Sequence, residues 1–574
     1  MVFECGDLIL EYLEKLEVEY VFGVPGGSIE PFYNALARSR RRGTIRPVTA
    51  RHETGAAFMA DGYARASGRL GVVCSTAGPG ATNLITGVAA AYADNVPVLV
   101  ITAQTALKRF GQGSLQESSC TSIDTLRMLA ECTRYNSLVS HPDQLEPKLL
   151  QAISLAFGPR PGPVHLSIPN DVMRHRLTRE GAPCTMNPVI AQVGAPPETA
   201  LSEALTLVRD ARNVTVVLGE RAQASVKDWV RLAEYRGWNL VTTPRAKGLI
   251  NSYHPLNKGV FGFAGHESAT RVLSAECAER VVLVGSGLDE VTTSGWNPDG
   301  MMNERLIHVS DHPDHLYRSA FAASTLLGDP GVVARRLLES MKEEAQCRQS
   351  VSISAEELPA FIAPELRTGC LTRQGCVKPQ ALMTHLSDIC PDNAHVLFDS
   401  GNSYLWGIHH WNTGARDNTR VHGQPFYIGI GFSSMGWAIG ASIGVAEAVR
   451  GAPVICFTGD GSYLMAGQEL TTALQENLNV LLVVLNDSAL GMVRHGQAIG
   501  GGEAIANELP VIDYAAMVAA MGIESYRIAS MESLLELDIK SILGRPGPCL
   551  LDIAIDPDEI PPMGARIKVL TGAN

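Results

Sequence analysis

Two acidic residues in the last third of the chain stand where oxygen ligands for a metal ion would be expected. Asp460 follows the apolar run VICFTG, and Asp487 follows the next such run, LLVVLN. Magnesium prefers carboxylate or carbonyl oxygens and takes its remaining ligands from phosphates and water. Gly459 and Gly461 would let the backbone approach a diphosphate closely, and a helix starting near Ser462 would offer free amides. The pattern predicts a metal and diphosphate site at two strand ends.

Two further residues, Glu53 and Met435, indicate a functional site only when the motifs around them are considered. Glu53 ends the triplet RHE and opens the helical pattern TGAAFMADGYARASG. By itself, a glutamate at a helix start is most often a surface charge that complements the helix dipole. Met435 lies in the Gly-rich stretch GIGFSSMGWAIGASIG, where a methionine is by itself most often a packing residue.

The elements that must position these residues alternate in type along the chain. Strand-like runs such as YVFGVPG, LGVVCSTAGPG and VICFTGDG end in Gly, Pro or small polar residues, and Ala-rich helical segments follow them. This alternation is typical of parallel sheets covered by helices, which bind ligands beyond the carboxyl ends of their strands. We expect an α/β protein with three doubly wound parallel-sheet domains, over residues 1–181, 190–345 and 375–574. A Pro-containing linker over 182–200 and a polar segment from Lys342 to Lys378 would separate them.

The composition excludes several classes of protein. The chain has 574 residues, of which 45% are hydrophobic and 18% charged, so that it can build several packed domains. A formal net charge of -12 argues against a nucleic-acid partner. The 12 cysteines form no CxxC pair, which is typical of a reducing cytoplasm. The N-terminal apolar stretch carries acids, which predicts an amphipathic helix and no signal peptide or membrane span.

Taken together, the motifs resemble those of thiamine diphosphate-dependent enzymes. GDG followed by an Asn-containing turn after the next strand is similar to the metal and diphosphate motif of that superfamily. The order GVPGG, RHE, DGYAR, STAGPGATN and VPVLVITAQ is similar to its pyrimidine-binding domain. VFGVPGGSIEPFYNAL, SLQES, GMV and PPMG resemble the large subunit of acetohydroxyacid (acetolactate) synthase. The resemblance implies a pyrimidine-binding, a central and a diphosphate-binding domain, in that order.

The resemblance also implies how the cofactor would be held. Glu53 would bond the aminopyrimidine ring and favour its imino form, Met435 would hold the two rings in a V, and the main-chain oxygen of Ser433 would accept from the amino group. The implied Mg²⁺ ligands are Asp460, Asp487 and the main-chain oxygen of Ala489. Other implied cofactor contacts are Pro79, Asn83, Ser400, Gly401, Asn402, Ser403, Gly459, Gly461, Ser462, Leu490, Gly491, Met492 and Val493.

One metal position departs from the family, which usually has Asn where this chain has Asp487. The extra carboxylate adds a negative charge beside the diphosphate. We therefore expect a tighter dependence on metal than an Asn site has.

The positions beside the reacting carbon are implied to be Gly26, Gly27 and Gln116, and the glycine amides could hydrogen-bond a developing alkoxide. Two synthase features are missing, because Gly496 replaces a Trp of the acceptor pocket and Val291 replaces an Arg that binds the acceptor's carboxylate. A wider acceptor pocket is expected. Arg494 and His495 are as compatible with a replacement carboxylate clamp as with a solvated loop pair. The substrate contacts that we expect are Leu115, Arg494, His495 and Gly496.

We therefore expect decarboxylation of a 2-oxo acid, with pyruvate the favoured donor, and addition of the resulting enamine to an aldehyde, ketone or 2-oxo acid acceptor. Acetolactate synthase proper, a simple 2-oxo acid decarboxylase and a 2-hydroxyacyl-CoA or oxalyl-CoA lyase stay open as alternatives. A nucleotide-binding protein that keeps the fold without the reaction is the alternative outside enzymes.

The partners that the resemblance implies are further copies of the chain, as a homodimer or homotetramer with active sites at the subunit interface. VLGER, TTPRAKG, GFAGHES, VGSGLDE and HVSDHPD resemble the flavin domain of the synthases. The absence of that domain's RFDD motif leaves open whether FAD is retained. We expect the protein in the cytoplasm, with no membrane partner.

Overall fold

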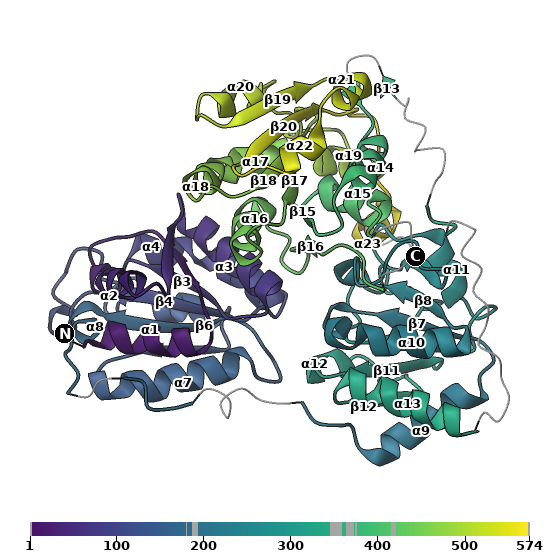
Figure 1. The fold of residues 1–574 in the computed structure, drawn as a ribbon, viewed down its shortest axis with the longest axis horizontal. Coiled ribbons are helices and arrows are strands. Elements are labelled where there is room, and N and C mark those ends of the chain that lie inside the picture. Colours follow the sequence, from purple (N-terminus) through teal and green to yellow (C-terminus); the bar gives the residue numbers. More distant parts are fainter. Residues whose placement is uncertain are drawn as a thin grey trace.

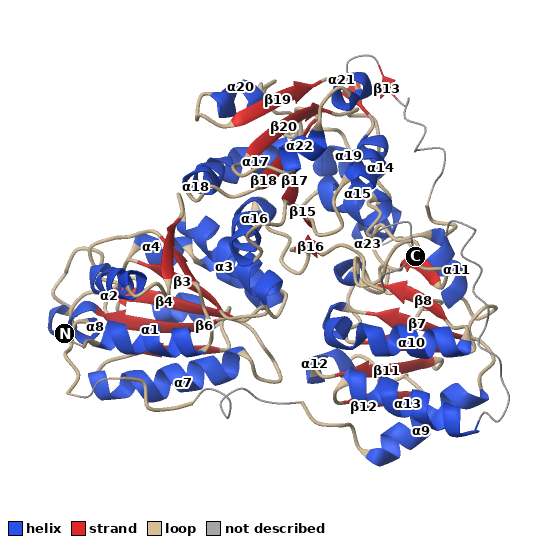
Figure 2. Cartoon of the chain, in the orientation of Figure 1, coloured by secondary structure: helices blue, strands red, loops and turns tan. Residues whose placement is uncertain are grey.

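The computed structural model describes residues 3–178, 181–185, 193–344, 359–362, 372–373, 376–414 and 421–571. These residues form three six-stranded parallel sheets with flanking helices, which follow one another along the chain (Figure 1, Figure 2). The expected fold class is confirmed. Residues 186–192 of the expected linker and most of the polar segment between Lys342 and Lys378 lie outside the described residues. Within the described ranges, no helix combines the length and apolarity needed to cross a membrane.

The first sheet has the strand order β2-β1-β3-β4-β6-β5. Its inner strands read as continuous apolar runs because helices cover parallel strands on both faces. The strands are β1 (Tyr20–Gly23), β2 (Arg46–Thr49), β3 (Gly71–Ser75), β4 (Val98–Gln104), β5 (Tyr135–Leu138) and β6 (Val164–Pro169). The helices are α1 (Cys5–Lys15), α2 (Glu30–Arg41), α3 (Glu53–Ser67), α4 (Pro79–Asn83), α5 (Ile85–Ala93), α6 (Thr125–Ala130), α7 (Leu145–Ala156) and α8 (Asn170–Met173).

The second sheet has the order β12-β11-β10-β7-β8-β9. Its strands are β7 (Val214–Leu218), β8 (Asn239–Thr242), β9 (Asn257–Val260), β10 (Arg280–Val284), β11 (Leu306–Ser310) and β12 (Ser324–Leu327). Its helices are α9 (Glu198–Asp210), η3 (a 3-10 helix, Glu220–Ser225), α10 (Val226–Arg236), α11 (Glu267–Leu273), α12 (Pro313–Leu316) and α13 (Pro330–Glu344).

The third sheet has the order β16-β15-β17-β18-β20-β19, and a separate antiparallel pair joins β13 (Thr372–Arg373) to β14 (Cys376–Val377). The strands of the sheet are β15 (His395–Phe398), β16 (Phe426–Ile428), β17 (Val454–Gly459), β18 (Val480–Asn486), β19 (Glu524–Ile528) and β20 (Cys549–Ala554). The helices are α14 (Pro379–Ile389), α15 (Asn402–His410), α16 (Trp437–Ala448), α17 (Asp460–Ala466), α18 (Leu470–Gln475), α19 (Gly491–Ile499), α20 (Tyr514–Ala519), α21 (Met531–Leu535), α22 (Ile539–Leu543) and α23 (Gly564–Thr571).

The first and third sheets are joined by the contact of α3 with α16, which lie side by side in Figure 1. Glycines permit the close approach, since a Cβ at Gly62 would overlap the main chain of Ala441 and a Cβ at Gly444 would overlap that of Met59. One hydrophobic core runs through both helices and into both sheets. The helix that begins with Glu53 is therefore packed directly on the unit that carries Asp460.

Candidate active site

The two predicted metal acids meet at neighbouring strand ends. β17 and β18 pair in register up to Gly459 and Leu485, which brings the residues that follow them together. Asp460 is 1% exposed, and burial together with the nearby Asp487 carboxylate raises the pKa of Asp460 to about 7. Burial also raises the pKa of Asp487. Among the described residues, Oδ2 of Asp460 has no hydrogen-bond partner, which is costly for a buried carboxylate and typical of a cation ligand.

A cavity of about 160 Å³ opens at this edge of the sheet. The structure brings together fifteen sequence-predicted residues in its wall: Ser400, Gly401, Asn402, Ser403, Met435, Gly459, Asp460, Gly461, Ser462, Asp487, Ala489, Leu490, Gly491, Met492 and Val493. Leu485 and Ile555 complete the wall and were missed, because an apolar residue at a strand end carries no sequence signal for a site. Oδ1 of Asn402 is a second buried oxygen without a partner in the described part of the chain.

Two glycines of this cavity, Gly461 and Gly491, leave no room for a side chain. A Cβ at Gly461 would lie 2.5 Å from Leu490, and a Cβ at Gly491 would lie 2.5 Å from Oδ2 of Asp487. The backbone therefore forms part of the cavity surface itself, as a diphosphate site requires.

Arg494 turns towards Asp487 and His495 towards Asn402, and neither is among the residues that line the cavity. Arg494 forms an ion pair with Asp487 at 3.4 Å and donates a hydrogen bond to the main-chain oxygen of Pro557. His495 contacts the same oxygen through Nε2 at 3.0 Å. A Cβ at Gly496 would meet nothing within 4 Å. There is therefore open space beside Gly496, the residue expected to stand where the synthases have a Trp.

Glu53 is the first residue of α3 and is 9% exposed. Its carboxylate accepts a hydrogen bond of 2.9 Å from the side chain of Asn83. The backbone just before it is fixed by Glu469 of the third unit, which accepts from the amides of Arg51 at 3.0 Å and His52 at 2.8 Å. Glu469 is 1% exposed, and sequence reasoning missed it because nothing local connects it to residues so far away in the chain.

The other predicted residues of the first unit lie around Thr76 and Gly78, near Glu53. A Cβ at Gly26 would lie 2.6 Å from Thr76, and a Cβ at Gly78 would lie 3.0 Å from Gln116. Gln116 has a positive φ of 59°, and Leu115 beside it is 89% exposed. The remaining predicted positions of this unit are Gly27, which has nothing within 4 Å of a Cβ, and Pro79, the first residue of α4.

These residues and the diphosphate cavity form two separate groups within one chain. The cavity wall is drawn from residues between Ser400 and Ile555, and none of the residues that line it belongs to the first unit. Met435 and Ser433 lie on the loop between β16 and α16, where Ser433 has a positive φ of 58° and its main-chain oxygen accepts from Ser400 at 2.9 Å.

Comparison with known proteins places this geometry in a family. Residues 3–125, 201–337 and 399–553 match, respectively, the N-terminal TPP binding domain, the central domain and the C-terminal TPP binding domain of thiamine pyrophosphate enzymes. A probable acetolactate synthase large subunit of Methanocaldococcus jannaschii is 30% identical over 97% of this chain and 93% of its own. The large subunit of acetolactate synthase isozyme 1 of Escherichia coli is 29% identical, over 99% and 98%.

Among solved structures, a putative thiamin diphosphate-dependent enzyme from Mycobacterium smegmatis has the same fold, with a TM-score of 0.76. It covers 96% of this chain and 99% of its own at 22% identity. The three matched domains, the full-length relatives and the buried acids at the strand ends lead to one conclusion: this chain belongs to the thiamine pyrophosphate enzymes and resembles the large subunit of acetolactate synthase.

Proposed function

We propose that the chain holds thiamine diphosphate through a divalent metal ion, decarboxylates a 2-oxo acid, and transfers the remaining fragment to a carbonyl acceptor. The observation that carries the proposal is the buried Oδ2 of Asp460, which has no hydrogen-bond partner among the described residues. Asp460 and Asp487 lie together in the wall of one cavity, to which glycines contribute. Two carboxylates and the main-chain oxygen of Ala489 would be a hard-oxygen donor set that fits Mg²⁺. A cation there would also relieve the repulsion between the two acids.

When bound, the cofactor supplies a ring carbon that attacks the donor's carbonyl carbon and a cationic ring that accepts the electrons left by carbon dioxide. Glu53 would hold a proton at the aminopyrimidine nitrogen, and Asn83 orients its carboxylate. The amides of Gly26 and Gly27 would stabilise negative charge on the donor's oxygen.

The acceptor proposed for this chain is an aldehyde or ketone. Gly496 faces open space, so a bulky acceptor would fit where the synthases have a Trp. The guanidinium of Arg494 already pairs with Asp487 and Pro557, and an acceptor carboxylate would have to compete with both. Acetolactate synthesis from two molecules of pyruvate is the second candidate, and the names of the two relatives favour it.

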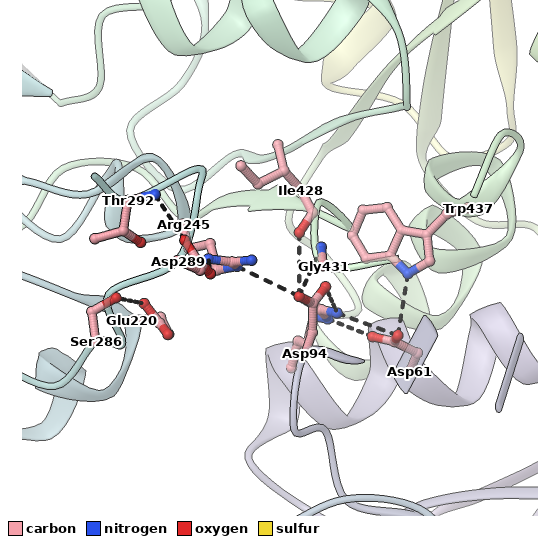
Figure 3. Close-up of polar contacts among 11 residues, drawn as sticks. Asp61, Asp94, Glu220, Arg245, Ser286, Asp289, Thr292, Ile428, Gly431 and Trp437 are labelled. Carbon is pink, nitrogen blue, oxygen red and sulfur yellow. Dashed lines mark hydrogen bonds and ion pairs between the residues drawn. The ribbon is translucent and has the colours of Figure 1, made fainter. Parts of the chain in front are cut away.

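The contacts of three charged residues in the central unit argue against a bound flavin. Glu220 begins η3 directly beyond β7, where a dinucleotide's pyrophosphate would need free amides, and its carboxylate accepts from Ser286 at 2.9 Å. Nε and Nη2 of Arg221 donate to the two carboxylate oxygens of Asp311, at 2.5 and 2.6 Å. Arg245 lies between Asp94 and Asp289 (Figure 3). Both arginines beside Glu220 are thus engaged by carboxylates, and we propose that the enzyme works without FAD.

The separation of the two groups of residues supports a dimer. Glu53 belongs to one group and Asp460 to the other, and no residue of the first unit is among those that line the diphosphate cavity. A second copy that placed its Glu53 over the diphosphate cavity of the first would complete the site. We therefore propose active sites at the interface between two subunits.

The experiment that tests the function is incubation with pyruvate, thiamine diphosphate and Mg²⁺, alone and with a panel of aldehydes and ketones, followed by mass spectrometry. We expect mixed hydroxyketones to form faster than acetolactate. Acetolactate as the fastest product would favour the second candidate, and free acetaldehyde as the main product would indicate a simple decarboxylase. Consumption of no 2-oxo acid under any of these conditions would contradict the proposal.

A further inference from the structure

The loop that carries Ser433 and Met435 is held at three points by the first unit (Figure 3). At its start, the main-chain oxygen of Ile428 accepts from Arg65 at 3.3 Å. In its middle, the amide of Gly431 donates to Asp94 at 3.0 Å. At its end, Nε1 of Trp437 donates to Asp61 at 3.2 Å. The three residues that hold the loop, Asp61, Arg65 and Asp94, are called the loop clamp below.

The loop clamp is itself a single ionic unit. Arg65 forms ion pairs with Asp61 and with Asp94, the latter at 2.9 Å, and its guanidinium lies 4.9 Å from the ring centre of Trp437. The side chains of the two acids are 0% and 3% exposed. Buried carboxylates that lose their cation are strongly destabilising, so the three side chains hold one arrangement. Arg245 of the central unit adds a second cation, 3.5 Å from Asp94.

The contact leaves the loop little freedom. A Cβ at Gly431 would overlap Oδ1 of Asp94, and a Cβ at Gly429 would lie 2.6 Å from the ring of Trp437. Beyond the loop clamp, Asp399 accepts from the amide of Gly436 at 2.9 Å. Between the anchored ends, the backbone turns at Ser433, which has a positive φ. Met435 follows this turn and lies in the wall of the diphosphate cavity.

We propose that Asp61, Arg65 and Asp94 are positioning residues for the rings of the cofactor, acting through the loop that carries Ser433 and Met435. The inference rests on the proposed function, in which those two residues contact the cofactor's rings. The metal acids are held apart from the loop clamp, since Asp460 and Asp487 lie at the ends of β17 and β18. The helix that begins with Glu53 thus also holds in place the loop that brings Met435 into the wall of the diphosphate cavity.

This separation gives the test, because the loop clamp should affect binding of the rings and leave binding of the diphosphate unchanged. Arg65→Lys and Asp94→Asn weaken its charge-assisted bonds, and Trp437→Phe removes one donor while it keeps an aromatic ring and all three charges. Arg69→Lys is the matched control, since Arg69 follows the same helix and pairs with Glu17 and Glu19 at the surface. Calorimetric titration of each purified variant with thiamine diphosphate and with inorganic pyrophosphate, both with Mg²⁺, measures the two affinities.

We expect Arg65→Lys and Asp94→Asn to bind thiamine diphosphate roughly tenfold more weakly, and Trp437→Phe a few-fold more weakly. Pyrophosphate affinity should stay within about twofold of wild type. The near-ultraviolet circular dichroism of the bound aminopyrimidine should change in these variants and not in Arg69→Lys.

Trp437→Phe keeps the proposal testable if a charge variant does not fold. Equal losses for thiamine diphosphate and pyrophosphate in the folded variants, or no loss for either, would overturn the proposal. Wild-type protein that bound pyrophosphate but not thiamine diphosphate would overturn the proposed function and this inference with it.

Discussion

The ion pair between Asp487 and Arg494 leads to a prediction about metal affinity that the extra metal carboxylate alone would not give. In the family an Asn is usual at the position of Asp487, so the native site has one more negative charge and a cation beside it. The two side chains are 3.4 Å apart and are 7% and 27% exposed. Their gross Coulomb attraction is about 5 kcal/mol at an effective dielectric constant of about 20. Arg494 therefore offsets much of the charge that Asp487 adds.

The perturbations are Asp487→Asn, Arg494→Gln and the double variant. Asp487→Asn should bind Mn²⁺ at least tenfold more weakly, because a charged ligand is lost while the guanidinium stays. Arg494→Gln should bind Mn²⁺ more tightly, because the carboxylate is then uncompensated. The double variant should lie close to wild type, since the net charge is restored. For unfolding, we expect a coupling free energy of about 1–3 kcal/mol between the two positions.

Electron paramagnetic resonance of Mn²⁺ and urea unfolding measure these quantities on the same samples. Opposite shifts in metal affinity for the two single variants are the signature of charge compensation. Additive effects of the two substitutions on the free energy of unfolding, or metal affinity in Asp487→Asn that is unchanged or tighter, would refute the reasoning.

Three further predictions concern single residues. Glu469→Gln should destabilise the fold by about 1–3 kcal/mol and lower kcat, because the NH₂ group of the new glutamine would face the main-chain amides of Arg51 and His52. Thermal unfolding and turnover measurements, with Gln468→Ala as the control, check this. Gly496→Trp should shift products of a pyruvate and aldehyde mixture towards acetolactate, as mass spectrometry would show; an unchanged product ratio would mean that Gly496 does not border the acceptor. Burial lowers the pKa of Lys247 from 10.5 to about 7, so the folded state binds fewer protons than the unfolded chain. The resulting loss of stability is complete below about pH 7 and fades as the pH rises to 10.5. Lys247→Met should therefore be more stable than wild type by up to about 4 kcal/mol at pH 7, less the contribution of the hydrogen bond lost to Ile408. Urea unfolding should show that this advantage vanishes at high pH, and an advantage independent of pH would contradict the prediction.

The sequence contains enough information for the strands and for the diphosphate half of the site. Buried parallel strands appear as apolar runs, and the residues just beyond them are local in the chain, so Asp460, Asp487 and the glycines could be placed together in advance. The expected α/β class with three sheets is confirmed, whereas the exact domain boundaries stay predictions.

Contacts between distant segments could not be predicted in the same way. Asp61 and Arg65 have the spacing of a helical ion pair, but nothing in the sequence connects Asp94 with Gly431, which is 337 residues away. The same holds for Glu469 and the amides before Glu53. Such pairs form because α3 packs on α16, and that packing depends on glycines whose role is visible only when the two helices are together.

The most direct test of the central claim is turnover of pyruvate by protein stripped of metal and cofactor, with thiamine diphosphate and Mg²⁺ added back singly and together. The account predicts turnover only when both are present, and a much higher Mg²⁺ requirement in Asp460→Asn, because the unpartnered Oδ2 is lost as an anionic ligand. Turnover by the stripped protein, or the same Mg²⁺ requirement in Asp460→Asn as in wild type, would contradict it.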